Sequence, residues 1–248
     1  MAARRCFSSR LSASVKVWAA LHRLDPELSM RTLLAGAALA ALVPVLAQAA
    51  EPVTLSYKLG IVSDYRFRGV TFSDREPALQ GGVTASAGNG LYGWVWGSTI
   101  ADYGGADTEL DAAVGWTGAA GGLTLDVSAA RYGYPGGKGV DYWEFPVSAA
   151  HAAGDWTWAV GAAWSPEQDA LGGQDNRYGY ARAAWTSPKA PVSVTAQLGR
   201  EHGAFAPDGK WDWSLGATRK IKALELGLTY VGSDRAGDTV VATVTAGF

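Results

Sequence analysis

The sequence predicts an all-β fold: a transmembrane, up-and-down, antiparallel β-barrel of about 12 strands. Three observations predict this fold. Apolar and polar residues alternate along most of the chain after residue 50, the connections alternate between short and long, and tryptophans gather near the predicted strand ends. A period of two is typical of a strand with two different faces. No segment after residue 50 approaches the roughly 18 continuous apolar residues of a membrane helix.

The first 49 residues differ from the rest of the chain. A short positive start is followed by an apolar run from Leu33 to Leu46, and Ala47-Gln48-Ala49 has the small-x-small pattern of a cleavage site. This apolar run is too short for a membrane helix. A long basic n-region is one interpretation of the residues before it, and a misassigned start is the other. The predicted organisation is a misassigned N-terminal extension at 1–29, a signal peptide at 30–49 and an outer-membrane β-barrel at 50–248.

Charge and cysteine content exclude several classes of function. The whole chain has 21 Lys+Arg and 23 Asp+Glu. The first 49 residues contain six of the basic and two of the acidic residues, which leaves 15 basic and 21 acidic residues and a net charge of −6. A negative chain argues against a nucleic-acid partner. The only cysteine, Cys6, lies in the predicted removed part, so we expect neither disulfides nor thiolate chemistry.

The alternating segments cover the exported chain from end to end. In VTLSYKLGI, Val53, Leu55 and Tyr57 share one face, and Thr54 and Ser56 share the other. An even number of such strands closes into a barrel with both ends of the chain on the same side. The predicted strands are 53–66, 77–87, 91–101, 107–118, 122–133, 140–152, 155–164, 176–186, 191–201, 210–220, 223–232 and 239–248.

The connections between these segments distinguish a barrel from a secreted β-sandwich. A sandwich also has alternating strands, but it needs a strongly aliphatic core face, and its connections need not alternate in length. The eighth segment is the least regular, because either face must carry an arginine, Arg177 or Arg182. The tight connections are 88–90, 119–121, 153–154 and 221–222. The longer ones, rich in Gly, Pro and Asp, are 67–76, 134–139, 165–175, 202–209 and 233–238.

Tryptophan and the C-terminal residue favour a membrane barrel. Indole is amphipathic and prefers the headgroup boundary, so tryptophans near strand ends predict an aromatic girdle. Phe248 ends an alternating strand, which resembles the signal by which the barrel-assembly machinery recognises bacterial outer-membrane proteins. The predicted girdle is Trp94, Trp96, Trp116, Trp143, Trp156, Trp158, Trp164, Trp185, Trp211 and Trp213.

The stretch SDYRFRG, residues 63–69, sorts into an ionic and an aromatic face when it is treated as the end of the first strand. We expect Tyr65 and Phe67 to face lipid and the charged residues to face a wet lumen. One hypothesis is a charged constriction that selects solutes by sign. The other is a salt-bridge ladder in which the arginines pair with Glu109, Asp111 or neighbouring acids. The predicted lumen charge cluster is Asp64, Arg66, Arg68, Glu109, Asp111, Asp126 and Glu144.

Several blocks of sequence resemble the TorF-like family of porin-like proteins, long known only as conserved hypothetical proteins. The resemblance covers roughly residues 60–146 well and the remainder loosely. It implies an outer-membrane barrel that acts as a channel, and it supplies no firm substrate. The blocks are SDYRFRG at 63–69, Ser73, PALQGG at 77–82, GLYGWVWGS at 90–98, ELD at 109–111, GWTG at 115–118 and YGYPG at 132–136.

Catalytic and metal-binding patterns are weak. Only His151 and His202 follow the predicted signal peptide, and neither shares a strand with a suitably spaced serine. Two distant histidines without cysteine argue against a zinc site. Acids at 102–111 could gather around calcium, but such a cluster is more often a solvated loop. We therefore expect no enzyme activity, no cofactor and no metal.

The function predicted from the sequence is a passive channel for small solutes or ions in the outer membrane of a Gram-negative bacterium. The first alternative is a barrel with a closed lumen that has a structural or surface-binding role, and the second is an outer-membrane lipid-modifying enzyme. The expected partners are outer-membrane lipid, the barrel-assembly machinery and small solutes, with no nucleic acid. Solute identity is not encoded in any motif of the chain.

Overall fold

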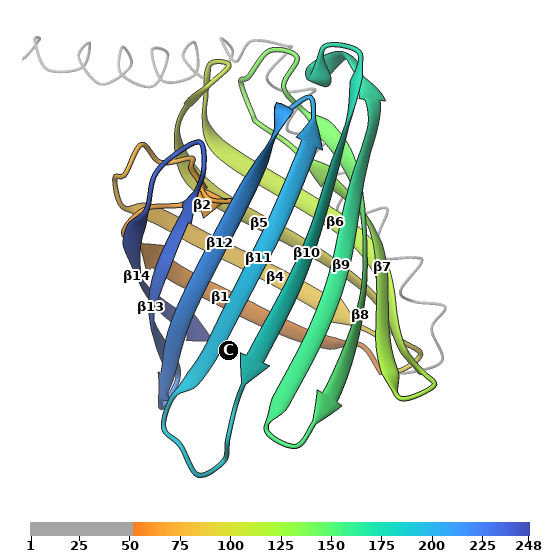
Figure 1. Ribbon diagram of the computed structural model, residues 1–248, viewed down its shortest axis with the longest axis vertical. Coiled ribbons are helices and arrows are strands. Elements are labelled where there is room, and N and C mark those ends of the chain that lie inside the picture. The colour runs from red at the N-terminus through yellow and green to blue at the C-terminus, as the bar shows by residue number, and fades with distance from the viewer. Residues whose placement is uncertain (1–51) are drawn as a thin grey trace, which may run out of the picture. The chain divides into compact units, whose positions relative to one another are not determined.

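The computed structural model describes residues 52–248, which form a closed antiparallel barrel with twelve strands in its wall (Figure 1). The predicted N-terminal extension and signal peptide lie outside the described residues. Within those residues no helix is long and apolar enough to span a membrane. The wall strands are β1 (Thr54–Val62), β4 (Ala78–Ser86), β5 (Leu91–Tyr103), β6 (Ala106–Ala120), β7 (Leu123–Tyr132), β8 (Tyr142–Ala153), β9 (Trp156–Gln168), β10 (Gln174–Trp185), β11 (Ser193–Gly203), β12 (Ala206–Ile221), β13 (Leu224–Ser233) and β14 (Thr239–Gly247).

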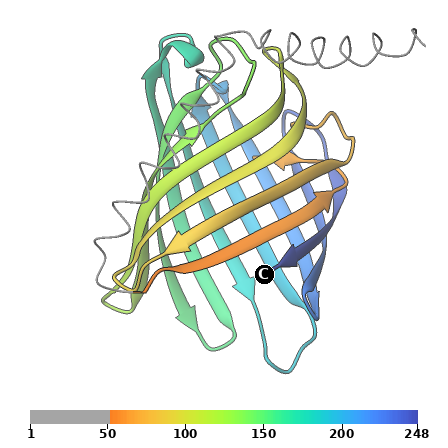
Figure 2. The ribbon, with the colours of Figure 1, turned by 180° about the vertical axis from the view of Figure 1, so that it is seen from behind.

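The remaining elements are small. A two-residue pair, β2 (Arg66–Phe67) and β3 (Val70–Thr71), lies between β1 and β4, and a short 3-10 turn, η1 (Asp169–Leu171), lies between β9 and β10. Each wall strand pairs with its neighbours in sequence, and β1 pairs with β14 to close the barrel. The strands of the wall are tilted relative to the barrel axis (Figure 2), as closure of a barrel requires. The predicted all-β, up-and-down barrel is confirmed.

The end of the chain takes part in barrel closure. Phe248 exchanges two backbone hydrogen bonds with Tyr57 of β1, with N···O distances of 3.1 and 3.0 Å. The Phe248 side chain is 75% exposed on the barrel exterior. The alternating C-terminal segment is therefore the seam of the barrel, and the role of Phe248 in assembly stays a prediction.

The outer face of the barrel is apolar. Ile61, Val160, Leu228 and Val240 are each more than half exposed, as are many other large apolar side chains on the same register. A continuous apolar exterior of this kind is typical of a surface that meets lipid. The tryptophans that are exposed on this face are Trp116, Trp143, Trp156, Trp158, Trp164 and Trp211.

The remaining predicted girdle tryptophans divide into two pairs. Trp185 and Trp213 stand opposite Trp156 and Leu198 respectively, so they share the outward register.

Trp94 and Trp96 point into the barrel, so their assignment to the girdle is wrong. Trp96 stands opposite the buried Asp111, and its ring meets that of Tyr65 edge-on, with 5.5 Å between centroids. Alternation groups both indoles on one face of β5 but does not say which face. Tyr65 provides Trp96 with an apolar neighbour inside the barrel.

The connections at the two ends of the barrel agree with the prediction in part. Tight turns join β4 to β5, β6 to β7, β8 to β9 and β12 to β13, but β10 and β11 are joined by the longer stretch 186–192. At the opposite end, the predicted loops 165–175 and 202–209 are largely strand, because β9 to β12 continue beyond their predicted ends. Pairing with a neighbouring strand there outweighs the turn preference of Pro and Gly.

Two inward tyrosines lie across glycines of the neighbouring strand. A Cβ atom at Gly161 would lie 2.4 Å from the Tyr180 ring, and a Cβ atom at Gly199 would lie 2.1 Å from the Tyr178 hydroxyl. Both distances are far below contact, so each ring occupies the space that a side chain would take.

Candidate functional site

The stretch SDYRFRG forms a tight hairpin inside the barrel and not the end of a strand. β1 ends at Val62, and β2 and β3 pair through Arg66 with Thr71 and Phe67 with Val70. Arg68 and Gly69 form the two-residue turn, with φ values of 49° and 79°, and two positive φ values are typical of a type I′ hairpin. A Cβ at position 69 would lie 2.4 Å from the Gly232 carbonyl oxygen, so this position requires glycine. Residues 63–77 are called the lumen hairpin below.

Backbone and side-chain hydrogen bonds fix the lumen hairpin to the barrel wall. Ala101 of β5 donates to the Phe72 carbonyl at 2.7 Å, and Arg66 Nη1 donates to the Gly237 carbonyl at 3.1 Å. Within the hairpin, the Tyr65 amide donates to Ser73 Oγ at 2.9 Å. The lumen hairpin is therefore attached on two sides, to β5 and to the connection between β13 and β14.

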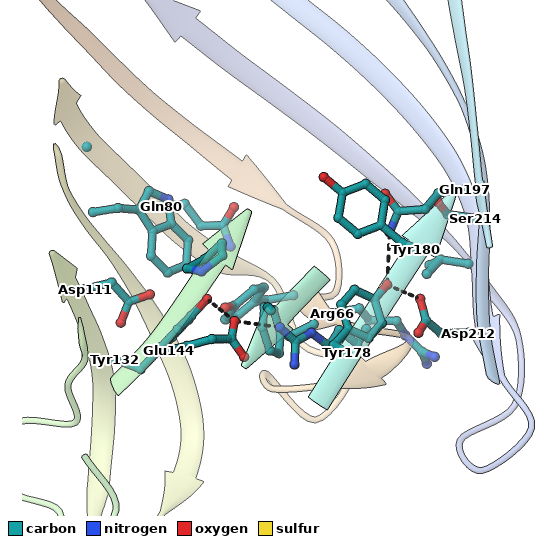
Figure 3. Close-up of a pocket in the computed structure, with 18 of the residues that line it drawn as sticks. Arg66, Gln80, Asp111, Tyr132, Glu144, Tyr178, Tyr180, Gln197, Asp212 and Ser214 are labelled. Atoms are coloured by element: carbon teal, nitrogen blue, oxygen red, sulfur yellow. Dashed lines mark hydrogen bonds and ion pairs between the residues drawn. The ribbon is translucent and has the colours of Figure 1, made fainter. Parts of the chain in front are cut away.

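Arg68, at the tip of the hairpin, connects two separate parts of the wall. Its Nη2 lies 2.6 Å from Glu144 Oε2 on β8, and its Nη1 lies 2.7 Å from Glu201 Oε1 on β11. Its guanidinium carbon also lies 4.6 Å from the Phe67 ring centroid and 4.1 Å from that of Tyr178. Figure 3 shows Glu144 and Tyr178 on opposite sides of the cavity. The planar fork of arginine suits this double attachment.

A second basic residue, Lys210, completes this ionic group. Lys210 Nζ lies 2.7 Å from Glu201 Oε2, and Asn176 donates to Glu201 Oε1 at 3.0 Å. Burial on its own lowers the pKa of Arg68, but the charges of Glu144 and Glu201 outweigh burial and raise that pKa above its ordinary value. Arg68 is therefore charged at any physiological pH. Arg68, Lys210, Glu144 and Glu201 are called the Arg68 clamp below.

Glu109 and Asp111 form a separate acidic pair on β6. Glu109 accepts a hydrogen bond from the Tyr134 hydroxyl at 3.0 Å, and Asp111 accepts one from the Gly133 amide at 3.4 Å. Within residues 52–248 neither makes an ion pair, and Glu109 Oε2 has no hydrogen-bond partner there. The predicted pairing of the arginines with these two acids is wrong, because the hairpin turn places Arg68 between Glu144 of β8 and Glu201 of β11, and Arg66 pairs within the hairpin.

The other predicted charges also have definite positions. Arg66 pairs with Asp64 of its own hairpin at 2.7 Å. Asp126 lies apart on β7, where it accepts a hydrogen bond from the Tyr92 hydroxyl at 2.9 Å. The structure thus divides the predicted cluster into an Asp64–Arg66 pair and an Arg68–Glu144 pair. Asp126 lines the same inner chamber without joining either pair.

The predicted lipid contact of Tyr65 and Phe67 is wrong. The Tyr65 ring packs against Phe72 with 5.6 Å between centroids, and the Phe67 ring packs against Tyr132 at 5.7 Å. Aromatic residues suit both a lipid-facing strand end and this inward hairpin, because each gives them an apolar neighbour. In the hairpin that neighbour is another aromatic ring of the protein. Burial and the nearby charge of Glu109 raise the pKa of Tyr65 far above its ordinary value, so its hydroxyl stays neutral.

Sequence reasoning missed the far side of the clamp. Lys210 and Asp212 alternate with tryptophans in KWDWS, which is a detectable sign of an inward polar face. The Tyr178 hydroxyl donates to Asp212 at 3.0 Å. Glu201 carried no such signal, because it stood at the predicted end of its strand.

The lumen hairpin separates two hollow regions of the lumen. The region on the side of the barrel's chain ends has a volume of about 890 Å³ and is called the inner chamber; the other has a volume of about 570 Å³ and is called the outer chamber. Phe67 borders both, so the hairpin is the partition between them. The inner chamber is lined in part by Ser56, Lys58, Thr84, Ser148, Thr229 and Thr243. The outer chamber is lined in part by Phe67, Phe72, Tyr103, Tyr134, Tyr142 and Phe205.

The two histidines do not lie together. His151 is near the inner end of β8, where its Nδ1 lies 3.0 Å from the Gly122 carbonyl oxygen. His202 is at the other end of the wall, next to the end of β11. Within the described residues no group of three or more His, Cys, Asp or Glu side chains could hold a metal ion.

Residues 46–247 match the model of a family described as bacterial protein of unknown function (Gcw_chp). The chain belongs to this family. Its description does not include the TorF-like name, which stays a resemblance. Among curated proteins, none matches the chain.

Solved porin structures share the fold. A KdgM porin matches with a TM-score of 0.55 at 8% identity, covering 78% of this chain and 98% of the porin. A NanC porin matches with a TM-score of 0.52 at 10% identity, covering 78% and 98%. A KdgM porin in complex with disordered oligogalacturonate matches with a TM-score of 0.51 at 7% identity, covering 79% and 96%. At these identities the likeness concerns the fold alone.

Proposed function

We propose that this chain is a porin-like channel of the outer membrane through which small solutes or ions diffuse passively. The observation that carries the proposal is the lumen, which is hollow on both sides of the lumen hairpin. A barrel whose role was only structural would be expected to fill its interior with side chains, as small barrels do.

The wall of the inner chamber supports a wet path. Ser56, Thr84, Ser148 and Thr243 present hydroxyl groups to it, and hydroxyls can replace part of the hydration shell of a passing solute. The apolar exterior supports a place in a bilayer. The porins of the same fold make passive diffusion the first function to test.

A closed barrel is the second candidate. The Arg68 clamp favours it, because this buried ionic group spans the lumen and the hairpin that carries it is attached to the wall. The two candidates differ in one respect: whether ions pass the lumen hairpin.

Single-channel recording distinguishes the two. The exported chain is reconstituted in a planar bilayer beside a variant in which residues 65–72 are replaced by a short Gly-Ser linker. A channel predicts current steps from the unmodified protein and steps several-fold larger from the variant. A silent protein with a conducting variant identifies a closed barrel, and two silent proteins exclude both a channel and a removable plug. Shortening the 186–192 connection at the opposite end is the matched control.

A further inference from the structure

Aromatic rings line the outer chamber to an extent that passage of water and ions does not need. The rings come from separate segments: the lumen hairpin, the end of β5, the β7–β8 region and the β11–β12 turn. Tyr103 and Tyr134 lie 4.6 Å apart between ring centroids, and Tyr142 and Phe205 lie 5.1 Å apart. Because the rings brace one another, the arc they form is preorganised.

The size of the outer chamber suits a small molecule. Its volume of about 570 Å³ falls within the roughly 300–1,000 Å³ of typical ligand pockets. Such pockets combine apolar walls with a few polar groups that set orientation, and the outer chamber has this composition.

The charged residues of the outer chamber set the sign of its ligand. Asp74 and Asp102 both line it and are exposed, and neither makes an ion pair with another residue of 52–248. Glu201 and Lys210 also line it, but Lys210 is paired with Glu201, whose other oxygen is held by Arg68. The uncompensated charges are therefore the two aspartates, which attract cations and repel anions.

We propose that the outer chamber is a binding site for a small organic cation, such as a quaternary ammonium group on an apolar body. A cation over the face of an aromatic ring is attracted by the ring quadrupole. A bare metal ion fits poorly, because it needs several oxygen ligands and the described residues contain no such cluster. The aspartates would capture the cation at the mouth, and the rings would hold its apolar part.

This proposal does not depend on conduction. A ligand can enter the outer chamber from the outer end of the barrel without passing the lumen hairpin. Equilibrium binding therefore tests the site even if the proposed channel is found to be closed.

The test uses the exported protein, purified from membranes in detergent, and isothermal titration with three probes. Phenyltrimethylammonium is the cation, 2-phenyl-2-propanol is a neutral molecule of similar shape, and benzenesulfonate is the anion. We expect the cation to bind at least about tenfold more tightly than the neutral probe, and the anion not to bind. Equal binding of the cation and the neutral probe, preferred binding of the anion, or no binding of the cation would overturn the proposal.

Two pairs of variants locate the site. Combined Asp74→Asn and Asp102→Asn should weaken binding of the cation about fivefold at low salt, whereas Asp155→Asn, an exposed acid at the opposite end, should leave it unchanged. Phe205→Leu should weaken it severalfold, whereas Phe145→Leu on the lipid face should not. All four variants spare the Arg68 clamp, and the heat-modifiable band of folded barrel verifies folding. Equal effects of site and control variants would place binding elsewhere and reject the site.

Discussion

The inner and outer chambers share the wall strands β5, β8, β11 and β12 but are lined by different kinds of residue. Ser56, Thr84 and Ser148 give the inner chamber a hydroxyl surface, whereas rings such as Tyr103 and Phe205 dominate the outer chamber. Barrel closure constrains the backbone and the lipid constrains the outer face, but neither constrains the inward residues. The inward residues are therefore free to differ between the hydroxyl-lined inner chamber and the ring-lined outer chamber.

The partition between the chambers differs from both. The side chains of Arg68, Glu144 and Glu201 are only 7%, 1% and 2% exposed, whereas Lys58 in the inner chamber is exposed. The charged side chains of the partition are therefore buried from solvent, whereas Lys58 in the inner chamber is exposed to it. Because desolvation decides what an ion pair contributes, equal charge changes should have unequal effects in the two places.

The largest expected effect concerns which chamber faces the outside of the cell. Asp169→Cys introduces a thiol at the end that holds the outer chamber, and Lys189→Cys introduces one at the end that holds the chain ends. With both chain ends in the periplasm, an impermeant maleimide on intact cells should label only the first. Residues 50–248 contain no cysteine, so background labelling is low. Labelling of only Lys189→Cys would reverse the orientation, so that the inner chamber would face the outside of the cell.

The next effect concerns the stability of the partition. Arg68→Ala leaves two buried carboxylates without their shared cation, and breaking a buried pair costs about 3–5 kcal/mol. Arg131→Ala is the control, because its pair with Asp141 has side chains that are 45% and 38% exposed and contributes at most about 1 kcal/mol. Thermal unfolding in detergent measures both. Similar losses of stability for the two variants would show that the Arg68 clamp is not shielded from water.

A smaller effect concerns ion preference. Combined Arg66→Gln and Arg68→Gln removes two positive charges and leaves the acids of the partition, so reversal potentials in a salt gradient should shift toward cations. The shift should shrink at high salt, since the Debye length falls from about 10 Å at 0.1 M to about 3 Å at 1 M. A variant with unchanged ion preference but lower melting temperature would favour the salt-bridge ladder over the selective constriction.

The smallest effect is expected in the inner chamber. Lys58 is exposed and makes no ion pair with residues of 52–248, so Lys58→Gln should change the free energy of unfolding by less than about 0.5 kcal/mol. Its effect on ion preference should be below that of the arginine pair. Thermal unfolding and reversal potentials measured together test this. A loss comparable to that of Arg68→Ala would remove the contrast between wet and dry charge.

The sequence predicts the wall well and the interior poorly. Nine of the twelve wall strands begin and end within two residues of their predicted ranges, because an apolar exterior and a more polar interior impose a strict alternation on them. The other three, β1, β9 and β12, each differ by four residues at one end. The ambiguous eighth strand follows the same logic: Arg182 lines the inner chamber, and Arg177 lies outside, near the strand end, where it pairs with Asp175.

The interior was less predictable because its neighbours are other side chains. Tyr65 and Phe67 occupy alternating positions, as on a strand, and Trp96 is of the residue type expected in an aromatic girdle. All three nevertheless contact other aromatic rings of the protein. A residue's local pattern cannot distinguish a lipid tail from an aromatic ring. The one local sign of the hairpin was Arg68-Gly69, since glycine after a polar residue between two short strands favours a tight turn.

The inner width of this barrel depends on the absence of side chains at Gly161 and Gly199, the glycines beneath Tyr180 and Tyr178. Each ring lies against the wall because Gly161 or Gly199 leaves room for it. One methyl group at either position would lift a ring toward the axis, while the strand number and the hydrogen-bond ladder stayed the same. The aperture can thus change by the size of one side chain at a time, which lets related barrels differ in calibre without differing in architecture.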